Sequence, residues 1–140
     1  MTQSNDDIIK TLKEHAKGRF YYMGCPYSNK DPRLVNRNLN KSMTVAGQLI
    51  ARGLFVHHPT FAAHHLAYEY KFPTDFQFWA DYNNAFIDAS CGFIACQILG
   101  WERSRGLEYE LNYVKNRPKF TIVYATLDEE DVVQLSWRSW

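Results

Sequence analysis

Short apolar or aromatic segments alternate with helical segments along this chain, and this alternation limits the folds available to it. Four segments predict strands, namely 19–24 (RFYYMG), 54–59 (LFVHHP), 91–99 (CGFIACQIL) and 119–125 (KFTIVYA). Polar caps and apolar residues at helical spacing predict helices over 4–18, 33–52 and 74–89, and in a segment that ends near residue 116. Strands that alternate with helices favour a parallel sheet with helices on both faces.

Two segments are less regular. Residues 60–73 predict a helical turn followed by a loop that Pro73 closes, and residues 126–137 predict a last helix or a short terminal segment. Thr74 is expected to cap the helix over 74–89, with Asp75 in its first turn. No repeat or linker interrupts the chain, so residues 1–140 are expected to form a single domain.

Composition excludes several classes of protein. The formal net charge is +1 and charged residues make up 22%, which gives no support for nucleic-acid binding. No apolar run approaches the roughly 20 residues of a membrane helix, and the first residues are too polar for a signal peptide. Three cysteines without a CxxC motif suggest neither a disulfide framework nor a zinc site. We therefore expect a cytoplasmic protein without nucleic-acid or membrane partners.

Ligands of open parallel sheets bind outside the carboxyl ends of the strands. Three segments should meet at that rim, namely 24–28 (GCPYS), 57–65 (HHPTFAAHH) and 99–106 (LGWERSRG). The first reads either as a substrate-cradling loop or as a plain strand-to-helix turn. As a cradle, it would contribute Gly24, Pro26, Tyr27 and Ser28.

The third rim segment offers an anion site. Ser104 and Gly106 precede a helix, so free N–H groups and a hydroxyl there could hold a phosphate or a ribose hydroxyl. The same residues also fit a simple serine cap with a tight turn. Arg37 and Ser28 could lie near the same pocket.

Acidic side chains and histidines are the candidates for chemistry. Glu102, Glu108 and Glu110 lie in or near the last rim segment, and a helix glutamate is by default a solvated charge. The residue pattern alone does not identify which of these three glutamates faces the rim. Asp81 lies among aromatic residues, where a carboxyl can have a raised pKa and serve as a general acid.

Asp88 is a contact at the helix end or strand entry rather than a catalytic group, and we expect it among the substrate-binding residues. His57 is expected to contact substrate, because no HExxH motif or neighbouring ligand set points to a metal.

These residues together resemble the nucleoside 2-deoxyribosyltransferase superfamily, which includes the 2'-deoxynucleoside 5'-phosphate N-hydrolases and related nucleotide N-glycosidases. The resemblance spans about residues 19–126 and rests on three marks: the strand end YMGCPYS, an Asp on the helix before the third strand, and S-x-G-x-x-x-E, here Ser104, Gly106 and Glu110. The GCPYS loop, the GWERSRG loop and Trp79 also look like a little-characterised clade with GPYS and GW..S.G loops.

The resemblance implies a flavodoxin- or Rossmann-like three-layer sandwich with a four- to five-stranded parallel sheet. It also implies that Glu110 attacks C1' of the sugar and that Asp81 handles the proton of the base. Tyr22 would orient Glu110, and Ser104 and Gly106 would bind the sugar or its 5'-phosphate. Asp81 is one residue out of register with some members.

The implied substrate is a nucleoside or, preferably, a nucleoside 5'-monophosphate. Water would make the protein an N-hydrolase and a second base would make it a transferase, and neither needs a metal or cofactor. Members of the superfamily often complete their sites with a neighbouring subunit. The 16% aromatic content and the ending LSWRSW therefore predict a homodimer or higher homo-oligomer. The alternatives are a non-catalytic nucleotide sensor of the same fold and an interaction protein that uses its aromatic patches.

Overall fold

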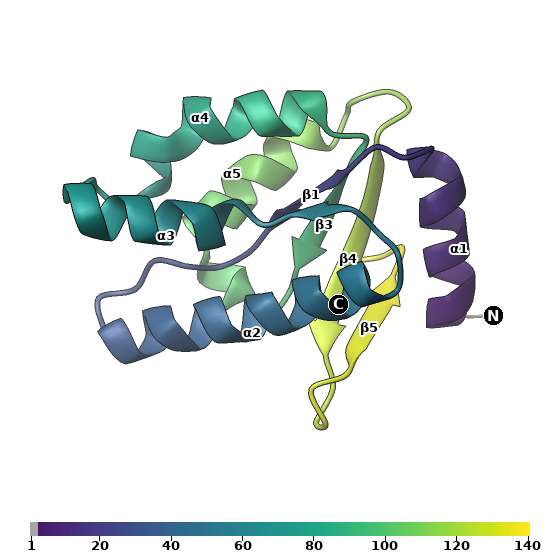
Figure 1. Cartoon of the computed structure of the whole chain (residues 1–140), viewed down its shortest axis with the longest axis horizontal. Coiled ribbons are helices and arrows are strands. Elements are labelled where there is room, and N and C mark those ends of the chain that lie inside the picture. Colours follow the sequence, from purple (N-terminus) through teal and green to yellow (C-terminus); the bar gives the residue numbers. More distant parts are fainter. Residues whose placement is uncertain (1–2) are drawn as a thin grey trace.

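The computed structural model describes residues 3–140 and shows an α/β fold built on one five-stranded sheet (Figure 1). The helices are α1 (Asn5–Ala16), α2 (Pro32–Ala51), α3 (Pro59–Tyr70), α4 (Phe76–Ala89) and α5 (Arg105–Val114), with a short 3₁₀ turn, η1 (Trp101–Arg103), before α5. The strands are β1 (Tyr21–Gly24), β2 (Val56–His57), β3 (Gly92–Cys96), β4 (Thr121–Leu127) and β5 (Val133–Ser136).

The sheet order is β2-β1-β3-β4-β5, and the first four strands in this order are parallel. The prediction of a fully parallel sheet is wrong at one edge, where β5 pairs antiparallel with β4. Strands β4 and β5 form a hairpin. Its turn and second strand occupy residues 126–137, where a helix or a short terminal segment was expected. Val133 and Leu135 alternate with more exposed neighbours, which is the two-residue period of a strand with one buried face.

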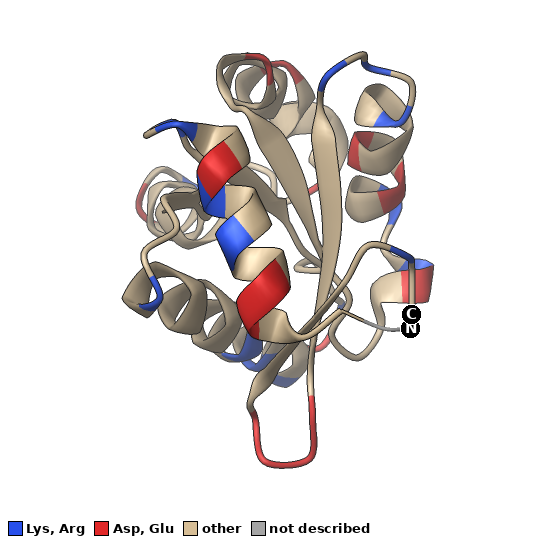
Figure 2. Cartoon of the chain, turned by 90° about the vertical axis from the view of Figure 1, so that its right-hand side faces the viewer, with Lys and Arg blue, Asp and Glu red and all other residues tan. Residues whose placement is uncertain are grey.

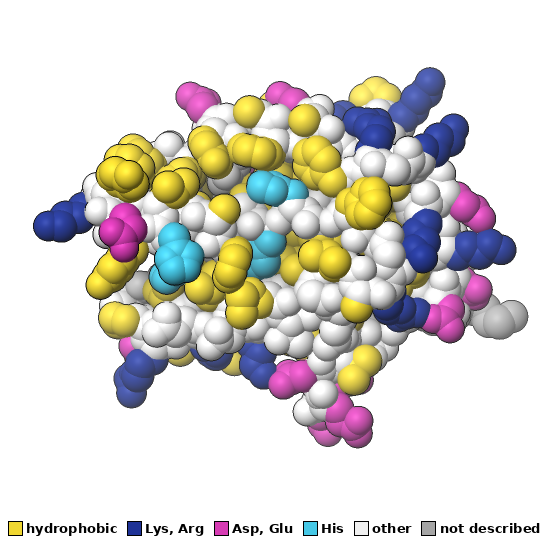
Figure 3. All heavy atoms as spheres, viewed as in Figure 1, with side chains coloured by type: hydrophobic (Ala, Val, Ile, Leu, Met, Phe, Trp, Pro, Cys, Tyr) yellow, Lys and Arg dark blue, Asp and Glu magenta, His cyan; other side chains and the backbone are white. Residues whose placement is uncertain are grey.

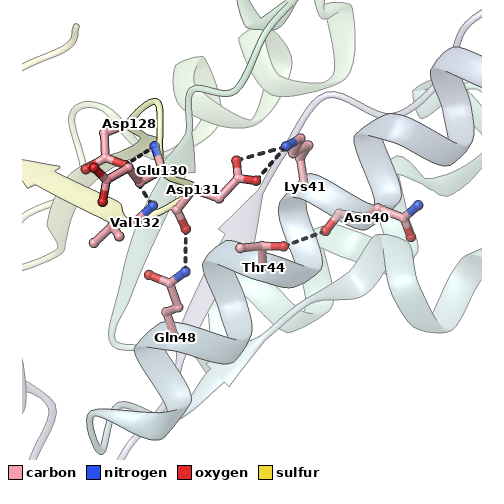
Figure 4. A network of polar contacts seen from close by, with 8 residues as sticks. All are labelled: Asn40, Lys41, Thr44, Gln48, Asp128, Glu130, Asp131 and Val132. Carbon is pink, nitrogen blue, oxygen red and sulfur yellow. Dashed lines mark hydrogen bonds and ion pairs between the residues drawn. The ribbon is translucent and has the colours of Figure 1, made fainter.

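Polar contacts fix the hairpin to α2 (Figure 4). The Asp128 carboxylate accepts hydrogen bonds from the backbone N–H groups of Glu130 and Val132, each at 2.9 Å. From α2, Gln48 donates to the carbonyl of Asp131 at 2.6 Å. Lys41 forms an ion pair with the Asp131 carboxylate at 2.8 Å. In Figure 2 the acidic tip of this hairpin projects from the body of the protein.

Two apolar clusters lie on opposite faces of the sheet. Tyr21 and Met23 of β1 pack with α1 and α2 on one face, while Tyr22 packs with α4 and α5 on the other. This split follows from the alternation of side chains along a strand. Helices therefore cover both faces, as expected of a three-layer arrangement.

Helix starts follow ordinary capping rules. Asp31 caps α2 with Pro32 in its first turn, and Ser104 caps α5. Asp75, rather than the expected Thr74, caps α4 by accepting from the N–H of Phe78. The segment expected as one turn and a loop is the 12-residue helix α3. No helix within residues 3–140 has the length and apolar character needed to cross a membrane.

Candidate functional site

A cavity of about 350 Å³ opens beyond the carboxyl ends of the parallel strands, where α3, α4 and the start of α5 converge. Its lining residues come from four segments. They are Tyr22, Cys25, Tyr27 and Ser28; Pro59, Thr60, Ala63 and Ala67; Thr74–Gln77, Trp79, Ala80 and Asn83; and Arg103–Gly106, Tyr109 and Glu110. All three predicted rim segments thus contribute to the cavity: 24–28 with most of its residues, 99–106 with its second half, and the histidine-rich segment mainly through α3.

Glu110 is the buried carboxyl of this cavity. Only 8% of the residue is exposed, and its Oε2 accepts a hydrogen bond from the hydroxyl of Tyr22. Burial raises the pKa of Glu110 to about 7, and the Tyr22 hydrogen bond partly opposes that rise by favouring the charged form. The carboxyl is therefore poised to change its charge near neutral pH.

Helix periodicity explains why this glutamate points inward. Leu107, Glu110 and Val114 form the buried face of α5, three and four residues apart. Glu108 is exposed on the other side, and Glu102 is exposed in η1. The Ser104 cap sets where the helix begins, because its Oγ accepts from the N–H of Leu107 at 3.2 Å.

Gly24 allows Glu110 to approach the end of β1. A Cβ atom at this position would stand 2.8 Å from Glu110 Oε1 and would also clash with the ring of Phe93. Any larger residue would therefore displace the carboxyl or the strand.

Tyr22 acts as a fixed, neutral hydrogen-bond donor. Its ring stacks on Phe93 with centroids 5.7 Å apart and contacts the ring of His57 at 5.9 Å. Burial and the neighbouring Glu110 carboxyl both raise the pKa of Tyr22 far above its usual range. The hydroxyl consequently keeps its proton and holds one carboxylate oxygen in place.

Polar groups surround the mouth of the cavity. The Ser28 hydroxyl donates to the carbonyl of Thr74 at 2.7 Å, which ties the loop after β1 to the start of α4. Arg103 and Arg105 line the mouth and are exposed. Gly106 is close to Phe76, since an added Cβ would lie 3.3 Å from Phe76 Cβ.

The loop after β1 contributes two further side chains. The Tyr27 hydroxyl hydrogen-bonds to Nδ1 of His64 on α3 at 2.5 Å. Cys25 is buried with its Sγ 3.5 Å from Thr60 Oγ1, and burial raises the pKa of the Cys25 thiol to about 11. Cys25 therefore stays a protonated thiol at neutral pH.

Six residues expected at the site do not line the cavity: Gly24, Pro26, Arg37, His57, Asp81 and Asp88. Asp81 is exposed on α4, because Phe76, Ala80 and Asn83 form the face of that helix that meets the cavity. The structure thus does not bring Asp81 into the cavity beside Glu110.

Gly24 makes room for Glu110, and the other four residues have local roles. Asp88 accepts from the Tyr113 hydroxyl at 3.0 Å and pairs with Arg117 at 2.9 Å, so it ties the end of α4 to α5. Arg37 donates to Asn38 Oδ1 and to the Leu99 carbonyl. His57 stacks on Phe86 with centroids 4.5 Å apart, behind Tyr22. Pro26 is part of the loop between two cavity residues.

Sequence reasoning missed the cavity residues of α4 and one of α5. Asp75, Gln77 and Asn83 supply polar groups, and Phe76, Trp79 and Tyr109 supply aromatic surface. Phe76, Trp79, Ala80 and Asn83 have the spacing of one helix face. Once one of them is known to face inward, this spacing predicts that the other three do so as well. Within residues 3–140, no group of three or more His, Cys, Asp or Glu is placed to hold a metal ion.

No curated protein matches the chain. The family model described as a domain of unknown function (DUF1937) matches residues 19–126. That stretch runs from just before β1 into β4 and includes every residue that lines the cavity. It covers well over half of the 140 residues, so the chain belongs to the DUF1937 family.

Proposed function

We propose that this protein cleaves or exchanges the N-glycosidic bond of a nucleoside 5'-monophosphate or nucleoside through a covalent intermediate on Glu110. One observation carries the proposal: a buried carboxyl that a tyrosine hydroxyl holds in place faces a cavity of about 350 Å³. The resemblance to the nucleoside 2-deoxyribosyltransferase superfamily supplies the reaction class.

The chemistry matches this geometry. As the bond between C1' and the base nitrogen breaks, its electron pair goes to the base and positive charge develops at C1'. An ionised Glu110 stabilises that charge and then forms a bond from a carboxylate oxygen to C1'. Attack by water on C1' releases the sugar and regenerates the carboxylate, whereas attack by a second base gives a new nucleoside.

A second carboxyl usually serves the leaving group, at about 5–5.5 Å from the first in retaining glycosidases. Asp81 does not line this cavity, whereas Asp75 does, at the start of α4. In this proposal Asp75 takes the place that the resemblance gave to Asp81, and the leaving base collects its proton from Asp75 or from water at the mouth.

A 5'-monophosphate is the preferred substrate. Arg103 and Arg105 flank Ser104 at the mouth, where the N-terminus of α5 also favours an anion. Arg37, by contrast, is engaged with Asn38 and Leu99 and does not line the cavity.

A panel of nucleosides and monophosphates, with ribose and deoxyribose, tests the proposal when free base is measured by chromatography. Wild-type protein should release base from at least one compound, and an added acceptor base would reveal transfer as a new nucleoside.

Glu110→Gln should abolish release, whereas Glu108→Gln on the exposed side of the same helix should retain it. Release that persists in Glu110→Gln would disprove the nucleophile. Tight binding without any release by wild type would instead indicate a nucleotide sensor.

We also propose that the protein is a homodimer or higher homo-oligomer and is located in the cytoplasm. Exposed aromatic side chains on and between α3 and α4 support a homodimer or higher homo-oligomer (Figure 3). All three cysteines are free and buried, which suits a reducing cytoplasm.

A further inference from the structure

Asn83 is the polar side chain that the middle of α4 directs toward the cavity. It lies three residues after Ala80 and seven after Phe76, on the helix face that lines the cavity. Asp75 and Gln77 also line the cavity, but Asp75 is the N-cap of the helix and Gln77 belongs to its first turn. Asn83 is therefore the amide on this wall that lies farthest along α4, and it is half-buried whereas Gln77 is exposed.

The Asn83 amide has an unmet hydrogen-bonding requirement. Its Oδ1 is shielded from solvent and has no hydrogen-bond partner. Asn84 Oδ1 and His57 Nε2 are also shielded and without partners, but neither residue lines the cavity, and Asn84 donates its amide to the Tyr109 hydroxyl at 2.9 Å. Buried polar atoms without partners are uncommon, and a ligand can supply the missing partner.

Aromatic rings form walls near this amide. Phe76 and Tyr109 lie with centroids 5.6 Å apart, and both line the cavity with Trp79. The Trp79 indole N–H already donates to the Pro73 carbonyl at 2.7 Å, so Trp79 offers the cavity an apolar surface. Flat apolar walls beside one amide suit a planar heterocycle whose face packs on the rings and whose edge meets the amide.

We propose that Asn83 reads the nucleobase, by pairing its amide with an edge that presents a donor beside an acceptor. An asparagine amide makes this two-bond contact with the N6 and N7 edge of adenine in DNA recognition. The terminal torsion of asparagine is soft, so the amide can turn its oxygen from its shielded position toward a ligand donor. This inference rests on the proposed function, because it requires a base to enter this cavity.

The experiment compares two Asn83 variants over the same panel of monophosphates. Asn83→Ala removes both bonds and should reduce base release from the preferred compound about tenfold or more. Asn83→Asp keeps the shape but presents only acceptors. It should shift preference toward guanine, whose N1–H and N2 amine are adjacent donors, and against edges that contain an acceptor, again by about tenfold in the ratio. Ala85→Asp, which adds the same charge on an exposed position of α4, should leave the preference unchanged.

Binding measurements separate this inference from the proposed function. Affinity of the panel and of ribose 5-phosphate, which lacks a base, is measured by calorimetry in the Glu110→Gln background. The Asn83 variants should change nucleotide affinity but not ribose 5-phosphate affinity.

If wild type binds nucleotides without releasing base while Asn83 still sets the preference, the reaction fails and the base-reading role stands. An unchanged base preference in both variants would overturn the role of Asn83, and so would equal losses for nucleotides and ribose 5-phosphate. A panel without any affinity would overturn both proposals.

Discussion

At the residue scale, the buried Glu110 carboxyl destabilises the folded protein when it is ionised. Burial raises its pKa from 4.5 to about 7, so the folded protein holds this proton more tightly than the unfolded chain. The contribution of Glu110 to stability is therefore full below about pH 4.5 and is lost as the pH rises through about 7. The full difference corresponds to about 3 kcal/mol.

Glu110→Gln tests this cost directly, because glutamine has a similar shape and cannot ionise. The free energy of unfolding, measured by urea denaturation, should favour the variant increasingly between about pH 4 and about pH 8.5, by up to about 3 kcal/mol. Glu108→Gln, at an exposed position, should show no such trend. A wild type and Glu110→Gln pair whose stabilities stay parallel across this range would show that Glu110 ionises normally.

Tyr22 should set the pH at which Glu110 becomes active. Its hydroxyl donates to the carboxyl and favours the charged form, so Tyr22→Phe should raise the pKa of Glu110 further. The rising limb of the pH profile for base release should move to higher pH, and release at neutral pH should fall. Tyr113→Phe removes a hydroxyl that bonds to Asp88 and should leave the profile in place. A Tyr22→Phe profile that is lower but not displaced would indicate a purely structural role.

The sequence predicted the positions of some of these residues better than others. The resemblance selected Glu110 through S-x-G-x-x-x-E, a pattern that includes the serine cap at which α5 begins. Asp81 lies in the middle of α4, whose rotation is set by packing that no local motif encodes. The cavity face includes Ala80 and Asn83 instead.

At the element scale, predictions failed where local preferences were weak. Helix α3 contains three alanines, two histidines and two tyrosines between positions 62 and 70, without a clear apolar stripe, so its length depends on tertiary contacts. Four acidic residues, 128–131, precede β5 and resemble the start of a helix. Asp128 instead uses its carboxylate to close a turn, and the Val133 and Leu135 alternation then forms a strand.

The β4–β5 hairpin should depend on Gln48 more than on Lys41. Gln48 donates to the exposed Asp131 carbonyl and accepts from the N–H of the buried Val133 at 2.9 Å, so Gln48→Ala leaves the Val133 N–H without its partner. The expected loss is about 1–3 kcal/mol in the free energy of unfolding. Lys41→Ala removes an ion pair between partly exposed groups and should cost less than about 1 kcal/mol. Urea denaturation of both variants checks the order, and an equal or reversed order would show that the ion pair anchors the hairpin.

At the scale of the whole molecule, alternating strands and helices were enough to predict the arrangement that builds the cavity. Four parallel strands bring the ends of β1 and β3 to one rim, although their residues are far apart in sequence. The antiparallel β5 lies at the other edge of the sheet from β2 and does not alter that rim. The depth of the cavity wall, however, depends on α3 and α4 together, which periodicity alone does not determine.

The same two helices carry the surface that we expect to join copies of the chain. Aromatic rings form a continuous series of neighbours from the surface inward: Tyr70, Phe72, Phe78, Trp79, Tyr82, Phe86, His57 and Tyr22. Tyr70, Phe78 and Tyr82 are 68%, 47% and 45% exposed, which is a large apolar area to leave in water. Figure 3 shows hydrophobic side chains gathered over this part of the protein.

Lysines at this surface should therefore separate the copies. In a twofold interface the same patch meets itself, so Tyr70→Lys together with Phe78→Lys would bring like charges face to face. Size-exclusion chromatography with light scattering should give a dimer or larger species for wild type and a monomer for the double variant. Phe55→Lys changes another exposed aromatic residue, 61% exposed beside β2, and should retain the wild-type mass. A monomeric wild type would contradict the assembly itself, whereas a double variant with the wild-type mass would place the interface elsewhere.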